Sequence, residues 1–319
     1  MNFIKVDPPT DFDFIPADFV PFKDREVCER VRKISGKDLE KHPNPDFKIE
    51  VHLNPHPVVI GHLFTRIKES YEQDKKFTVI LGNPEPETYL PLASLINYHR
   101  VNCRNVHIFA MDEWADQDGN IAPITYKASL ARSMIKYFVY AIDPELRMPM
   151  ENVHYPTKEN FSSYSQMIVD IGEGGADLCY SSPGWTGHIA FVDPVEEFIV
   201  EDINEYLKQT AKIIKLHPMT IMQNSLHGIF GQSGYIAAVP PKAATIGPFD
   251  VANARERIEI HSLLTNNTFS SWQRMVSRLI LHGPVTPLVP SSILQLMKTQ
   301  VYVSEEIAKP FDFWETVGY

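Results

Sequence analysis

Two short segments of the sequence carry side chains that could transfer protons. Asp112 and Glu113 follow an apolar run at 106–111, and His188 comes shortly after a second apolar run at 176–181. Ligands in an open α/β sheet collect at the carboxyl ends of its strands, so a carboxylate and an imidazole at two such ends could act on one substrate. A carboxylate can remove and return a proton, and an imidazole exchanges protons near neutral pH. The two segments therefore predict acid–base chemistry on a small carbon compound.

The elements that must position these residues alternate along the chain. Apolar runs typical of strands occur at 77–81, 106–111, 176–181, 243–247, 258–263 and 299–303. Stretches with helical spacing of apolar residues occur at 58–73, 89–101, 126–138, 161–172 and 269–281. Strands separated by helical stretches of about 10 to 15 residues predict an α/β fold, with a doubly wound, mostly parallel sheet and helices on both faces.

The N-terminal segment, residues 1–45, differs from the rest of the chain. It is polar and rich in proline, with one short helix expected near 25–34. Its scattered phenylalanines are Phe12, Phe14, Phe19 and Phe22. Because phenylalanine gains free energy from burial, we expect an arm that wraps the main body or a partner subunit, so that a homo-oligomer could form through it. We expect a single α/β domain over 46–319.

Composition narrows the partners and the compartment. The chain has 319 residues and a formal net charge of -10, which argues against nucleic acid as the main partner. Its three cysteines lie far apart without the spacing of a metal site, which is typical of reduced thiols in the cytoplasm. The first residues lack the apolar core of a signal peptide, and no apolar stretch approaches the roughly 20 residues of a membrane span. We therefore expect a cytoplasmic protein with no membrane partner.

The two proton-handling segments resemble those of a known family. The runs that carry the resemblance to glucosamine-6-phosphate deaminase are Met111-Asp112-Glu113-Trp114 and Gly187-His188-Ile189-Ala190-Phe191-Val192-Asp193-Pro194. Residues 291–296 are similar to the helix before that family's last strand, and the similarity extends over about 46–305. The 6-phosphogluconolactonases share the fold, but the run at 188–191 resembles the deaminases more. The chain is thus identified as a divergent member of the deaminase/isomerase family.

The resemblance implies carbohydrate chemistry on an amino sugar that needs no metal and no organic cofactor. It implies that Asp112 carries a proton between adjacent carbons of the sugar and that His188 protonates the ring oxygen and opens the ring. It also implies that Asp193 is the partner of His188 and that Glu113 is an accessory group. These four residues are the expected catalytic set of an isomerase or deaminase.

The chain departs from the family next to the histidine. Thr186 stands where the family has an aspartate, two residues before the histidine. A threonine hydroxyl can orient the imidazole but supplies no negative charge, so we expect a weaker acid–base partner at His188. Asp193 stands where the family has a glutamate and is shorter by one methylene.

The phosphate-binding groups of the family are also altered. The loop that is rich in Gly and Thr in the family reads Gly82-Asn83-Pro84-Glu85-Pro86-Glu87-Thr88 here. Its two prolines lack the N–H donor, and its two glutamates would repel a phosphate. The family's phosphate-binding arginine aligns with Ile221 and its lysine with Gln273, one position before Arg274. We expect a sugar that need not be phosphorylated, with contacts from Gly82, Asn83, Glu85, Glu87, Thr88, Thr186, Gly187 and Arg274.

Three functions stay open on these residues. The first is a proton-transfer enzyme of amino-sugar metabolism, the second a catalytically silent sugar-binding or regulatory protein, and the third a lactonase-type hydrolase. Trp114 and Trp185 fit either packing or stacking on a sugar face. The segment 203–235, which contains His217 and His227, is expected to be mobile and to cover the site.

Overall fold

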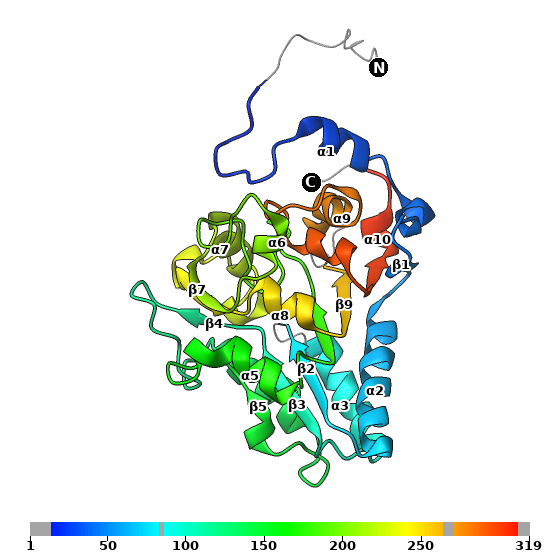
Figure 1. The fold of residues 1–319 in the computed structure, drawn as a ribbon, viewed down its shortest axis with the longest axis vertical. Coiled ribbons are helices and arrows are strands. Elements are labelled where there is room, and N and C mark those ends of the chain that lie inside the picture. The colour runs from blue at the N-terminus through cyan, green and yellow to red at the C-terminus, as the bar shows by residue number, and fades with distance from the viewer. Residues whose placement is uncertain (1–13, 83–85, 264–270, 312–319) are drawn as a thin grey trace, which may run out of the picture.

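A seven-stranded parallel sheet organises the computed structural model, which describes residues 14–82, 86–263 and 271–311. The strand order is β1-β10-β9-β6-β2-β3-β5 (Figure 1). The strands are β1 (Phe47–His52), β2 (Phe77–Leu81), β3 (Val106–Ala110), β5 (Val153–His154), β6 (Leu178–Ser181), β9 (Glu256–His261) and β10 (Thr299–Ser304). The mostly parallel α/β fold expected from the sequence is confirmed.

Helices cover both faces of this sheet because side chains alternate between the faces along each buried strand. The helices are α1 (Arg25–Val31), α2 (His56–Gln73), α3 (Pro86–Tyr98), α4 (Leu130–Tyr137), α5 (Tyr164–Ile171), α6 (Ile203–Tyr206), α7 (Pro218–Asn224), α8 (Pro248–Asn253), α9 (Gln273–His282) and α10 (Glu305–Ala308). Val79 of β2 packs with α2, α3 and α4 in one apolar core, whereas Ile80 of the same strand packs with α1, α5, α9 and α10 in the other. The sheet therefore separates two cores.

A second, three-stranded sheet lies beside the first, in the order β4-β8-β7. Its antiparallel strands are β4 (Asp112–Ala115), β7 (Lys212–Lys215) and β8 (Lys242–Thr245). The run predicted as a strand at 243–247 belongs to this sheet and not to the parallel one. Because β4 begins one residue after Met111, the chain passes from the main sheet into the small sheet at the predicted catalytic carboxylates.

The described part of the N-terminal arm is only partly covered. Phe22 packs against the core, while Phe14 and Phe19 are exposed. Further along, α1 packs against α9, and Val31 and Leu39 are fully buried. Phe12 lies outside the described residues. The chain from α1 onward therefore contributes to the main core, and assembly of copies through the arm stays a prediction.

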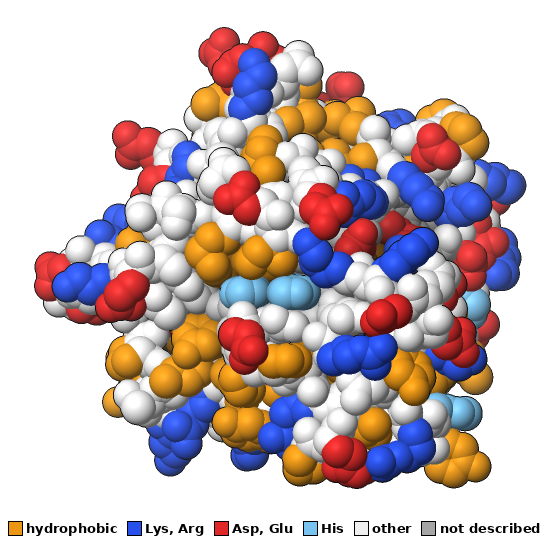
Figure 2. Space-filling model, turned by 60° about the horizontal axis from the view of Figure 1, so that its bottom comes forward, with side chains coloured by type: hydrophobic (Ala, Val, Ile, Leu, Met, Phe, Trp, Pro, Cys, Tyr) orange, Lys and Arg blue, Asp and Glu red, His pale blue; other side chains and the backbone are white. Residues whose placement is uncertain are grey.

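Charged side chains are mixed over the face drawn in Figure 2, where acidic and basic groups alternate with hydrophobic ones. This mixing fits the modest negative net charge of the chain. No helix in the described part of the chain combines the length and apolar character needed to cross a membrane.

Candidate functional site

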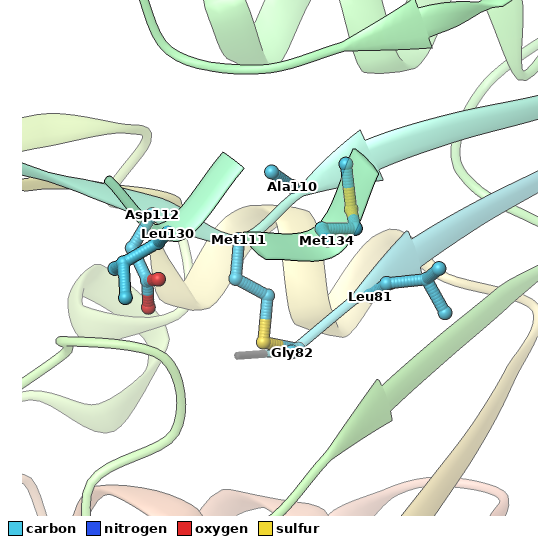
Figure 3. A pocket seen from close by; sticks show the side chains of 7 residues that line it. All are labelled: Leu81, Gly82, Ala110, Met111, Asp112, Leu130 and Met134. Atoms are coloured by element: carbon cyan, nitrogen blue, oxygen red, sulfur yellow. The ribbon is translucent and has the colours of Figure 1, made fainter. Parts of the chain in front are cut away.

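The carboxyl ends of β6, β2 and β3 meet in the middle of the main sheet. The Gly82 amide donates a hydrogen bond to the Tyr180 carbonyl at 3.1 Å, and the Met111 amide donates one to the Leu81 carbonyl at 3.0 Å. A tight pocket lies here, with no free room for a water molecule in this conformation, and it is lined by Leu81, Gly82, Ala110, Met111, Asp112, Leu130 and Met134 (Figure 3). Its lining is apolar except for the carboxylate of Asp112.

Asp112 is a buried carboxylate with no hydrogen-bond partner in the part of the chain that the structure describes. The residue is 3% exposed, and its side chain accepts no hydrogen bond from any described residue. Burial, and then the neighbouring charge of Glu113, raise the pKa of Asp112 well above its usual value. A carboxylate with a raised pKa and free oxygens can take up and return a proton, as the predicted base must.

Both carboxylate oxygens of Glu113, the next residue, accept hydrogen bonds. Its carboxylate accepts hydrogen bonds from the Ser129 hydroxyl at 2.5 Å and from the amides of Trp114, Leu130 and Ala131 at 2.9, 3.1 and 3.1 Å. Burial raises the pKa of Glu113 although these bonds oppose the shift. The carboxylate satisfies the free N–H groups at the start of α4, which is why that helix begins at Leu130 and not at 126.

His188 and Asp193 form a buried pair at the end of the β6 segment. The imidazole Nδ1 donates to Asp193 Oδ1 at 2.8 Å, and the hydroxyls of Thr186 and Thr220 donate to the same oxygen, each at 2.8 Å. The amide of His217 donates to Oδ2 at 3.0 Å. Burial favours a raised pKa for Asp193, but attraction to His188 and these hydrogen bonds outweigh it and hold the pKa below its usual value. Asp193 thus places against the imidazole the negative charge that Thr186 lacks.

The other nitrogen of His188 faces the loop that precedes it. With Nδ1 bonded to Asp193, Nε2 remains free to exchange a proton, and it accepts no hydrogen bond from a described residue. A Cβ on Gly184 would lie 2.2 Å from Nε2 and 2.6 Å from Oε1 of Gln223. Gln223 is buried and accepts the Trp185 amide at 2.7 Å. Only a glycine at 184 therefore allows this packing.

Gln223 and Thr220 were missed by the sequence analysis. Both come from α7, inside the segment expected to be a mobile cover. β7, in the same segment, pairs with β8, and the amide of His217 is held by Asp193. The segment therefore supplies part of the wall around His188, and its mobility stays a prediction.

Thr245 of β8 joins the two proton-handling segments. It lies opposite Asp112 in the small sheet, and its hydroxyl accepts the Phe191 amide at 3.1 Å. The Phe191 ring packs edge-on against His188 with centroids 5.9 Å apart, and also contacts Trp114 at 5.1 Å. Trp114 is buried, and its indole donates to the Ala128 carbonyl at 2.9 Å, which supports the packing role for this tryptophan.

Neutral side chains occupy the two aligned phosphate positions. Gln273 is buried, accepts the Leu263 amide at 2.9 Å and donates to the Pro183 carbonyl at 2.8 Å, so it ties the end of β9 to the loop before His188. Ile221 packs against the apolar core. The guanidinium of Arg274 makes no ion pair or hydrogen bond to a described residue, and its Nε is covered. Arg274 does not join the hydrogen bonds around His188.

The other predicted substrate contacts are dispersed. Asn83 and Glu85 lie outside the described residues. Thr88 is buried in the first turn of α3, with its hydroxyl 3.2 Å from His56 Nδ1. The side chain of Glu87 is 85% exposed and lies 3.9 Å from the His56 ring, in a surface groove between α2 and α3. Glu87 is therefore not among the residues that line the Asp112 pocket.

Gly187 has a structural reason to be glycine. Its φ of +76° is a conformation that L side chains rarely adopt, and a Cβ would lie 2.8 Å from the Val289 side chain. Its carbonyl accepts the Ser291 amide at 2.7 Å, which fixes the turn into His188 against the 3₁₀ helix at Pro290–Leu296. That helix precedes β10, as expected for 291–296.

At the carboxyl edge of the parallel sheet, the structure links a buried carboxylate, Asp112, to an oriented imidazole, His188, through Thr245 and Phe191. Within the described residues, no group of three or more His, Cys, Asp or Glu side chains is placed to hold a metal ion. The chemical groups of the site are a free carboxylate and a histidine oriented by a second carboxylate. Such a pair can move protons on and off a substrate.

Comparison with known proteins shows what the chain is similar to. No family model matches the chain. Glucosamine-6-phosphate deaminase from Lachnoclostridium phytofermentans is 31% identical over 157 residues, covering 47% of this chain and 57% of the relative. The enzyme of the same name from Caenorhabditis elegans is 25% identical over 257 residues, covering 77% and 84%. The chain thus spans under two thirds of the first relative and most of the second.

Solved structures agree on the fold. A monomeric glucosamine-6-phosphate deaminase superposes with a TM-score of 0.64 at 20% identity, covering 82% of this chain and 98% of the other. A 6-phosphogluconolactonase from Thermotoga maritima gives 0.55 at 16% identity, covering 81% and 99%. The chain is a divergent relative of the glucosamine-6-phosphate deaminases, and its fold is shared with 6-phosphogluconolactonase. The predicted resemblance is confirmed.

Proposed function

We propose that the protein is a sugar isomerase or deaminase-type enzyme that moves a proton between adjacent carbons of an amino sugar. Asp112 is the base, and His188 is the acid that opens the sugar ring. The observation that carries the proposal is that the two segments, joined through Thr245, hold one unpartnered buried carboxylate and one imidazole oriented by Asp193.

The chemistry follows from the free atoms of each group. His188 Nε2 gives its proton to the ring oxygen and takes the proton of the anomeric hydroxyl, so the bond between C1 and the ring oxygen breaks and an open-chain aldehyde forms. Asp112 then takes the proton from C2 while the imidazolium of His188 protonates O1, which gives an enolamine. Asp112 returns the proton to C1 while the imidazole takes one from the nitrogen, which leaves an imine at C2 for water to hydrolyse. Asp193 stabilises the imidazolium because it bonds to Nδ1 at 2.8 Å.

The contacts of Asp193 favour an active enzyme over a silent binding protein. Thr186 removes one charge near the imidazole, but the Thr186 hydroxyl bonds to Asp193 and so supports the charge that is present. A sugar-binding protein without catalysis would not need a buried carboxylate such as Asp112 to stay unpartnered, because burial of an unpaired carboxylate lowers stability.

The substrate differs from that of the family in the end remote from the reacting carbons. Ile221 and Gln273 are uncharged, and Gln273 is already bonded on both sides of its amide. A phosphate dianion would find no cation at either position. We therefore assign an amino sugar without phosphate as the substrate.

Solvent-hydrogen exchange tests this function. The protein is incubated in D2O with glucosamine, N-acetylglucosamine or glucosamine 6-phosphate, and deuterium at C2 is followed by NMR. The wild type should exchange an unphosphorylated sugar, and Asp112→Asn and His188→Ala should each abolish the exchange. Glu151→Gln, which removes an exposed carboxylate that is not part of the site, is the matched control and should leave the exchange unchanged. Absence of exchange with all three sugars would contradict the enzymatic assignment, and preference for the phosphorylated sugar would contradict the substrate.

A further inference from the structure

Three aromatic rings from three elements meet beside His188. Trp185 precedes the histidine in the same loop, Trp272 immediately precedes α9, and His227 follows α7. The two indoles pack edge to face with centroids 5.5 Å apart, and the His227 ring stacks on Trp272 at 6.5 Å. All three residues are half-buried, so this aromatic cluster lies at the surface of the site.

Each ring of the aromatic cluster carries a nitrogen without a partner among the described residues. Nε1 of Trp185, Nε1 of Trp272 and Nε2 of His227 are covered by protein, yet none of them bonds to a described residue. Trp114 provides the contrast, since its indole N–H is satisfied by the Ala128 carbonyl. Covered polar groups in proteins are nearly always paired, so three unpaired ones in one cluster indicate groups kept for a ligand.

We propose that Trp185, Trp272 and His227 form a subsite that binds an uncharged sugar ring next to His188. This inference rests on the proposed function and specifies its substrate class. A sugar ring has an apolar C–H face that stacks on an indole and hydroxyl groups at its edge that bond to ring nitrogens.

The charge of the aromatic cluster fits an uncharged ligand. Burial, and then repulsion from His188, lower the pKa of His227 to about 4, so its ring is neutral at neutral pH. The neighbouring polar side chains, Gln223 and Gln273, are amides. Arg274, a cation, lies two positions after Trp272 in the sequence. Titration with a sugar phosphate tests whether Arg274 makes the subsite prefer an anionic sugar.

Calorimetric titration of the full chain tests the subsite. N-acetylglucosamine, the uncharged probe, is titrated into the wild type, Trp185→Ala, Trp272→Ala and the control Tyr98→Ala, which removes an exposed aromatic ring on α3. The dissociation constant should rise at least tenfold in the first two variants and stay within twofold in the control. Trp185→Phe and Trp272→Phe, which keep a ring and lose the N–H, should give a smaller rise and serve where an alanine variant does not fold.

Three results would overturn the subsite. The first is wild-type affinity in the alanine and phenylalanine variants, and the second is no binding of N-acetylglucosamine to the wild type. The third is glucosamine 6-phosphate binding tenfold more tightly than N-acetylglucosamine. Asp112→Asn separates this inference from the proposed function. It should bind N-acetylglucosamine within twofold of the wild type while C2 exchange disappears. A wild type that binds through the tryptophans but exchanges no hydrogen would defeat the function and leave the subsite standing.

Discussion

Asp112 and Asp193 are both buried, at 3% and 0% exposure, but their surroundings are opposite. Asp193 accepts hydrogen bonds from one imidazole, two hydroxyls and one backbone amide, and its pKa is lowered. Asp112 accepts none from a described residue, and its pKa is raised. Burial alone therefore does not set the charge of a carboxylate, because the donors around it decide the direction of the shift.

The difference assigns a different task to each aspartate. Asp193 holds the imidazole of His188 in one orientation and contributes to stability. Asp112 reduces stability when it is ionised, since nothing compensates its lost hydration. Groups that reduce stability in this way persist where function needs them, so the unpartnered aspartate is the one expected to react.

Replacing the partnered aspartate should have the largest effect. Asp193→Asn removes the negative charge and leaves His188 and two threonine hydroxyls poorly paired, so the free energy of unfolding should fall by about 3–5 kcal/mol. Urea denaturation at pH 7 measures it, with the exposed Asp118→Asn as the control. A fall of less than about 1 kcal/mol would show that the network around Asp193 contributes little.

Replacing Asp112 should raise the free energy of unfolding at high pH, whereas replacing Asp193 should lower it. The pKa of Asp112 is higher in the folded than in the unfolded protein. Stability therefore falls as the pH rises from about 4 through the folded pKa. The loss is about 1.4 kcal/mol for each pH unit that separates the two pKa values. Asp112→Asn cannot ionise and escapes this loss. Thermal unfolding at pH 5 and pH 8 should show that the unfolding temperature of the variant, relative to that of the wild type, is higher at pH 8 than at pH 5. A variant that is less stable than the wild type at pH 8 would contradict the unpartnered state.

The sequence located both aspartates but could not distinguish their surroundings. Asp112 and Glu113 follow the same apolar run, and which of them is free depends on Ser129, 16 residues away, and on where α4 begins. The donors to Asp193 from His217 and Thr220 lie 24 and 27 residues further along the chain. Neither link leaves a local pattern in the sequence. The three rings of the aromatic cluster likewise come together only through the fold.

The parallel strands show which parts of the fold the sequence can predict. Strands such as β2 and β6 are buried along their whole length and appear as apolar runs. β1 was not predicted, because alternate residues such as Lys48 and Glu50 face solvent and leave no continuous run. β5 has two residues, and β4 and β7 are short and carry charged residues such as Asp112 and Lys212, so none of the three shows a continuous apolar run.

Removing one donor to Asp193 should give an intermediate effect. Thr220→Val keeps the shape of the side chain and deletes one hydrogen bond to a charged oxygen, which should lower the free energy of unfolding by about 1.5 kcal/mol. Thr186→Val should act similarly, and because both hydroxyls bond to the same oxygen their effects should not be additive. Urea denaturation of the single and double variants measures this coupling, and strict additivity would argue against a shared network.

The smallest effect on catalysis is expected at Glu113. Glu113→Gln keeps an acceptor for the first turn of α4, so stability should fall by about 1 kcal/mol and C2 exchange should stay within roughly threefold of the wild type. The comparison with Asp112→Asn, made in the same assay, sharpens the contrast between two adjacent carboxylates. Equal losses of exchange in the two variants would mean that Glu113 also handles the proton.

A titration of both aspartates in one sample tests the central contrast most directly. The side-chain carboxyl carbons are followed by ¹³C NMR across pH, and the signals are assigned with Asp112→Asn and Asp193→Asn. Asp112 should titrate above the ordinary aspartate value of about 3.9 and Asp193 below it. If the two carboxyls titrate together, or in the reverse order, Asp112 and Asp193 do not have the separate roles assigned to them.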